Sequence, residues 1–222
     1  MLKDYLQIHT LTLVILGKFN PTIIQPFWLV SKNLIREQEG KNAKIEIIHP
    51  QLVRFDLDWV FIEVTEDRFV LKTSKEPFFN PTKDLMESIF SYLPETPIRA
   101  MGINHLLHYN IPNEDLYYQI GDRLAPLSNW TDLQKEPRLL ELSVMSKKRD
   151  DGLPGQFTAK VQPSNELSTR TGLLLSLNDH LALHPQESER EGIIVRRAGE
   201  AWEGSFKRAE AIPSKLWENL TK

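Results

Sequence analysis

The chain has 222 residues, of which 41% are hydrophobic and 26% are charged. This balance is typical of globular proteins that fold in water, and it argues against a disordered chain or a membrane protein. The 27 basic and 30 acidic residues give a net charge of -3, which supplies no overall positive field for nucleic acid or an anionic membrane. We therefore predict a folded protein without a membrane partner.

The sequence contains no cysteine, which excludes disulfides, thiolate metal sites and cysteine nucleophiles. The N-terminus has an early acid, Asp4, and lacks the basic start, long apolar core and cleavage site of a signal peptide. The longest apolar run, 11–16, is much shorter than the ~20 residues that span a bilayer. These features predict a cytoplasmic protein.

The first half of the chain reads as one strand, one helix and then several strands. Residues 8–16 are rich in β-branched side chains, which favour a strand, and prolines at 21 and 26 suit the first turn of a helix. Alternating apolar and polar residues then predict antiparallel strands and a hairpin, at 45–50, 53–59, 60–64 and 69–73.

Two helices have clear start signals. Asn80-Pro81 predicts a helix with Asn80 as the N-cap and proline at its first position, ending before Pro94. Asn113, with two acids after it, predicts a second helix that ends near Ala125. Between them, residues 98–109 read as a strand.

The last third returns to strands and ends in helices. Strands are predicted at 138–145, 157–161 and 173–183, with a further short strand at 193–195. A helix is predicted from Ala198, and Pro213 is expected to break it. The basic stretch 147–149 is followed by two acids, so we interpret it as a solvated turn.

This order has few of the strict strand–helix alternations that indicate a parallel sheet, so it predicts an α+β fold with a largely antiparallel sheet. The stretch 97–109 is also echoed by 172–184, since both are apolar runs interrupted by Asn and His. We expect two weakly similar halves that form one sheet with helices packed on one face. The chain 1–222 would be a single domain, with 1–126 and 127–222 as its halves.

The two echoed stretches hold the candidate site residues, and they include four of the six histidines. The polar side chains in question are those of Asn104, His105, His108, Asn178, Asp179, His180 and His184. If the two strands are neighbours, His105, Asp179 and His180 could form a catalytic site, and these three with His184 could bind zinc or iron. Strand alternation puts His105 and His108 on opposite sides, whereas His180 and His184 share one side. The alternative is that these groups bond to backbone atoms at strand ends.

No common catalytic or cofactor motif is present. The sequence has no G-x-S-x-G, no S-x-x-K, no H-E-x-x-H, no phosphate-binding loop and no G-x-G-x-x-G, so we predict no cofactor. The aromatic residues of the predicted sheet alternate with acids as often as with bases, which gives weak support to RNA binding.

We therefore predict a non-enzymatic protein-binding subunit or accessory component of a macromolecular complex, with another protein chain as its partner. The alternative is a metal-assisted hydrolase that uses His105, Asp179 and His180. A second alternative is a nucleic-acid-binding accessory protein.

Overall fold

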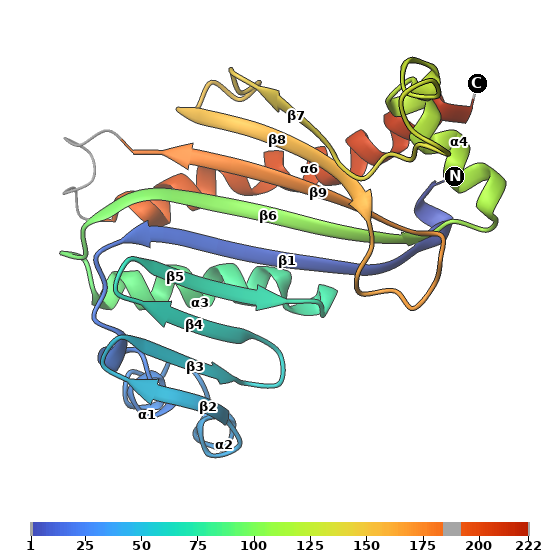
Figure 1. The fold of residues 1–222 in the computed structure, drawn as a ribbon. Coiled ribbons are helices and arrows are strands. Elements are labelled where there is room, and N and C mark those ends of the chain that lie inside the picture. The colour runs from blue at the N-terminus through green and yellow to red at the C-terminus, as the bar shows by residue number, and fades with distance from the viewer. Residues whose placement is uncertain (1, 184–191, 222) are drawn as a thin grey trace.

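The computed structural model describes residues 2–183 and 192–221 and contains one antiparallel sheet of nine strands (Figure 1). In chain order the strands are β1 (Leu6–Gly17), β2 (Lys44–His49), β3 (Leu52–Asp56), β4 (Phe61–Thr65), β5 (Arg68–Thr73), β6 (Ile98–Asn110), β7 (Leu142–Ser146), β8 (Gly155–Pro163) and β9 (Gly172–Ala182). Their spatial order is β2-β3-β4-β5-β1-β6-β9-β8-β7. The predicted α+β fold class with an antiparallel sheet is confirmed.

The two long helices lie on the same side of this sheet. The helices are α1 (Pro26–Ser31), α2 (Glu37–Lys41), α3 (Phe79–Tyr92), α4 (Glu114–Leu124) and α6 (Ile193–Thr221). In Figure 1, α3 lies behind β5, and α6 lies behind β6 and β9. We call the side that α3 and α6 cover the helix face, and the opposite side the open face.

The fold consists of two similarly built halves. Each half begins with a long strand, which is followed by a connection that contains one or more helices. The next strands form an antiparallel meander, and its last strand pairs with the long first strand. The first half comprises β1–β5 with α3, and the second comprises β6–β9 with α6. The halves join where β1 and β6 pair antiparallel, so in the sheet they divide between α3 and β6 rather than at residue 126.

The two echoed stretches both belong to the second half. They form β6 and β9, which are antiparallel neighbours, with Asn104 directly opposite Asn178. The strand in the first half that corresponds to β6 is β1, because each begins its half and the two meet at the centre. The similarity between the two stretches therefore does not arise from one half repeating the other. The sheet nevertheless consists of two halves with the same order of strands.

Strand alternation explains which residues form the core. Leu11, Leu13 and Ile15 of β1 are fully buried on the helix face, and Leu13 lies opposite Leu71 on β5 and Ile103 on β6. This side of the sheet meets α3 and the first part of α6 in one apolar cluster. A second cluster forms where α4 and the end of α6 meet the far ends of β6 and β9.

Three predicted helix boundaries were wrong. α3 begins at Phe79, directly after the 3-10 helix Glu76–Phe78, and the side chain of Asn80 is not a cap, because its Oδ1 accepts a hydrogen bond from Trp202 Nε1. The residues predicted as a strand at 193–195 begin α6, where Ile193 and Ile194 are buried in the core. Pro213 lies inside α6 and does not end it.

Candidate functional site

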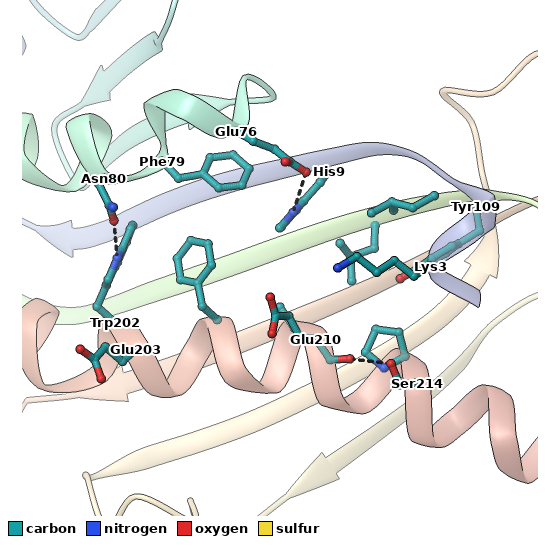
Figure 2. Close-up of a pocket in the computed structure, with 15 residues that line it drawn as sticks. Lys3, His9, Glu76, Phe79, Asn80, Tyr109, Trp202, Glu203, Glu210 and Ser214 are labelled. Atoms are coloured by element: carbon teal, nitrogen blue, oxygen red, sulfur yellow. Dashed lines mark hydrogen bonds and ion pairs between the residues drawn. The ribbon is translucent and has the colours of Figure 1, made fainter. Parts of the chain in front are cut away.

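A groove runs between α3 and α6 on the helix face, and it has a volume of about 790 Å³ (Figure 2). Its floor comes from β1 and β6, including His9, Leu107 and Tyr109. The start of α3 and the 3-10 helix before it form one wall, and α6 forms the other. We call this cavity the α3–α6 groove.

Aromatic side chains join the two walls at one end of the groove. Trp202 and Phe206 lie four residues apart on α6, so they share a helix face, and their ring centroids are 4.9 Å apart. Phe206 also packs against Phe79 of α3, with centroids 5.8 Å apart. The hydrogen bond of 2.9 Å from Trp202 to Asn80 adds a polar link between the same helices.

A line of hydrogen-bonded polar side chains leads from the floor of the groove into the protein. His9 Nε2 lies 2.9 Å from His105 Nδ1, and His105 Nε2 lies 3.1 Å from Ser205 Oγ. Ser205 in turn donates to Asp179 Oδ2 over 2.6 Å. We call these four residues the polar chain. His105, Ser205 and Asp179 are each at most 1% exposed, so all of it except His9 lies within the core.

Two arginines hold the inner end of the polar chain. Asp179 Oδ1 lies 2.9 Å from Arg149 Nη1 and 2.7 Å from Arg208 Nη2. Arg208 comes from α6, whereas Arg149 follows β7 and also pairs with Asp151. A buried carboxylate needs such partners, since an unpaired buried charge is strongly destabilising.

The hydrogen-bond pattern determines where the protons of the two histidines lie. Asp179 between its arginines is an acceptor, so the Ser205 hydroxyl donates to it and must accept from His105 Nε2. Burial, with smaller effects of His9 and Arg208, lowers the pKa of His105 to about 3, so its ring is neutral and its Nδ1 is an acceptor. His9 therefore donates to it from Nε2.

His9 consequently presents a bare Nδ1 to the groove. Burial lowers the pKa of His9, and Glu76 opposes this effect only in part, so the neutral ring is favoured near pH 7. A neutral imidazole that donates from Nε2 has its lone pair on Nδ1. This atom lies 3.9 Å from Glu76 Oε1, across the mouth of the groove (Figure 2).

The structure brings together some of the predicted site residues and separates others. His105 and Asp179 both lie on the helix face and are connected through Ser205. His180 follows Asp179 directly on β9 and so points to the open face, where strand alternation also places His108. His184 lies outside the described residues. The predicted set of His105, Asp179 and His180 therefore does not line one cavity.

The two asparagines and His108 are bonded on the open face. Asn178 Nδ2 donates to Asn104 Oδ1 across the β6–β9 pair, and Asn104 donates to the Thr12 carbonyl. His108 Nδ1 lies 2.8 Å from Ser164 Oγ. Within residues 2–183 and 192–221, no group of three or more His, Asp or Glu side chains is arranged to hold a metal ion.

Sequence reasoning missed His9, Ser205 and the two arginines. His9 shares the alternation of Leu11, Leu13 and Ile15, which signals a polar residue on the buried side of β1. Ser205 lies on the same helical stripe as Trp202 and Ala209, which is a comparable signal. The charge pattern around Arg149 predicts a solvated turn, and this is wrong for Arg149, whose side chain is only 1% exposed.

The two edges of the sheet differ in how they are protected. β2 carries Lys44 and Glu46, and its pairing with β3 is interrupted by a bulge between Ile45 and Ile47. Charges and bulges are the usual means of preventing edge-to-edge association. β7 has the sequence Leu-Ser-Val-Met-Ser, without charge or proline, and pairs with β8 in an uninterrupted register.

Apolar side chains are exposed along β7 and just before it. Val144 and Met145 are 58% and 49% exposed, and Leu140 is 78% exposed. A cavity of about 380 Å³ lies next to this approach, between α4 and β8, with Leu140 and Val161 in its lining. On the outer side of β7, no strand pairs with it in the part of the chain that the structure describes.

Comparisons with known proteins place the chain in no family. No protein-family model matches it, and no curated protein matches it significantly. As for membranes, none of the described helices combines the length and the apolar character needed to cross a bilayer.

Proposed function

We propose that this chain is a non-enzymatic protein-binding subunit or accessory component of a macromolecular complex, and that its partner adds a strand along β7. The observation that carries the proposal is the unprotected edge of β7, which has neither a charge nor a bulge. An extended segment can add to such an edge through main-chain hydrogen bonds, while pockets for its side chains provide specificity.

The surroundings of β7 support the same proposal. Val144 lies opposite Ala159 on the helix face, and Met145 lies opposite Thr158 on the open face, so an added strand would meet an apolar side chain on each side. The cavity beside Leu140 could take a further side chain of the partner. The lack of cysteine supports a reducing compartment, and we keep the cytoplasm as its location.

Of the two alternatives, neither has a specific observation in its favour. The hydrolase required His180 to join His105 and Asp179, and His180 points to the other face of the sheet. For nucleic acid, Arg54 on the sheet is already paired with Glu63 and Glu46.

The proposal predicts that a charge at β7 disrupts the complex. In native mass spectrometry of the full chain isolated from its own host, we expect a stoichiometric second protein, with slower hydrogen exchange in β7 of the complex. Val144→Lys should reduce its occupancy about tenfold or more, because an edge lysine opposes strand addition.

Ile47→Lys on the other edge strand is the matched control and should retain the partner, since β2 is already protected. Both substituted side chains are exposed, so both variants should fold. Recovery of the chain alone, or a complex that survives Val144→Lys with β7 amides unprotected, would contradict the proposal.

A further inference from the structure

We propose that the α3–α6 groove is a binding site for an organic cation, an ammonium or guanidinium group on an apolar chain, whose charged group is held by Nδ1 of His9 and the carboxylate of Glu76. The site is separate from the β7 edge, and the inference does not depend on the proposed function. Four features of the groove support it.

The first feature is the fixed direction of the polar chain. Because His105 accepts from His9 Nε2, the His9 ring cannot turn to offer a donor to the groove without breaking a buried hydrogen bond. Nδ1 is therefore held as an acceptor 3.9 Å from a carboxylate oxygen of Glu76. Two adjacent acceptors, one of them charged, suit a ligand group with several N–H donors and a positive charge.

The second feature is the charge of the groove lining. Glu76, Glu203 and Glu210 contribute carboxylates from both walls, and Lys3 is the one cationic side chain among the lining residues that the structure describes. The Lys3 ammonium extends toward the middle of the groove, and the Glu210 side chain rises from α6 into the same space (Figure 2). The lining therefore has three carboxylates and one ammonium group. The groove as a whole therefore has a net negative charge, which attracts cations and repels anions.

The third feature is the apolar part of the lining. Phe79 lies beside His9, with ring centroids 4.8 Å apart, and Phe206 packs against Phe79 in the same lining. Aromatic faces attract ammonium and guanidinium groups and also bury hydrocarbon. Leu107 and Tyr109 continue this surface along the floor, so the chain attached to the cation would lie over β6.

The fourth feature is size. At about 790 Å³, the groove is within the range of ~300–1,000 Å³ that is common for sites of small organic ligands. It is open along one side, so a long side chain of a peptide could enter as well as a free amine. Both sources share the chemistry of a cationic group on an apolar chain.

The test is isothermal titration of the full chain with n-hexylammonium and n-butylguanidinium at pH 7.5, with n-hexanol as the neutral probe. We expect saturable binding of the cations, at least tenfold tighter than that of hexanol. Glu76→Gln should weaken cation binding by about three- to tenfold, the range for a charge-assisted hydrogen bond at a partly exposed group. Because Glu76 is exposed, this variant should fold.

The matched control is Glu218→Gln, which removes a carboxylate from α6 outside the groove and should leave binding unchanged. A second variant, His9→Phe, keeps an aromatic ring but removes the acceptor, and should also weaken cation binding. Equal binding of hexanol, no binding of either cation at millimolar concentration, or equal affinity of Glu76→Gln would overturn the proposal.

A further arm distinguishes the two sources of the cation. A capped tripeptide with lysine between two leucines is titrated beside n-hexylammonium. Tighter binding of the peptide identifies a basic side chain of a protein as the occupant, and tighter binding of the free amine identifies a small molecule.

Discussion

At the scale of single residues, the polar chain is where this protein departs from an ordinary apolar core. His105 has no exposed surface, yet both of its ring nitrogens have partners, His9 on one side and Ser205 on the other. Ser205 is the central member, because its hydroxyl both accepts from His105 and donates to Asp179. Removal of the Ser205 hydroxyl would therefore leave both His105 Nε2 and Asp179 Oδ2 without this hydrogen-bond partner.

We therefore expect Ser205→Ala to be destabilising. The unsatisfied Nε2–H of His105 and the carboxylate oxygen of Asp179 should lower the free energy of unfolding by about 1–3 kcal/mol, measured by urea denaturation. Ser214→Ala on the same helix is the control. Its exposed hydroxyl bonds only to the Glu210 carbonyl, so it should change the value by less than about 0.5 kcal/mol. Equal effects of the two substitutions would show that the buried hydroxyl has no special role.

At the scale of elements, the start of β8 depends on a close approach to β9. Gly155 has a φ of 133°, and a Cβ added there would collide with the carbonyl oxygen of His180. The same segment brings Arg149 to Asp179, so the position of β8 and the inner end of the polar chain are connected. Gly152, three residues earlier, also has a positive φ, of 73°, but has open space around it.

These two glycines give a matched pair of substitutions. Gly152→Ala should lower the free energy of unfolding by about 1 kcal/mol, because it adds only the strain of a left-handed backbone. Gly155→Ala should lower it by more than about 2 kcal/mol, since it adds a collision with backbone that cannot move aside easily. Thermal or urea denaturation measures both values. Similar losses at both positions would mean that β8 can shift away from β9.

At the scale of the whole molecule, the β1–β6 pair joins the two halves of the sheet. Ile103 on β6 is fully buried and lies opposite Leu13 of the first half and Asp179 of the second. The halves share this continuous sheet, and one apolar cluster joins the first half to β6, β9 and the first part of α6. The prediction of a single domain implies that they unfold together.

Ile103→Ala tests this prediction. The cavity that it leaves should lower the free energy of unfolding by about 2–5 kcal/mol. In hydrogen exchange measured across a urea series, peptides from β3–β4 and from β8–β9 should show the same midpoint, and both midpoints should decrease equally in the variant. Separate midpoints, or a shift confined to β8–β9, would indicate two independent domains.

The sequence by itself determined the fold class and most strands, because alternation along β1, β3 and β4 is a local property that burial on one face imposes. It also predicted the start of α4, where Asn113 caps the helix through Leu116 N. Local signals were wrong for Asn80 and Pro213, since packing of α3 and α6 against the sheet and each other outweighs capping and helix propensity there.

Only the tertiary structure decided the candidate site. His105 and Asp179 were identified from their unusual place in apolar strands, but their partners come from three separate segments of the chain: His9 from β1, Arg149 from the residues after β7, and Ser205 and Arg208 from α6. Strand order and register determine which of these side chains meet, and one position along β9 separates Asp179 from His180 by the thickness of the sheet. These side-chain contacts depend on the pairing of strands that are far apart in the sequence, and local periodicity does not specify that pairing.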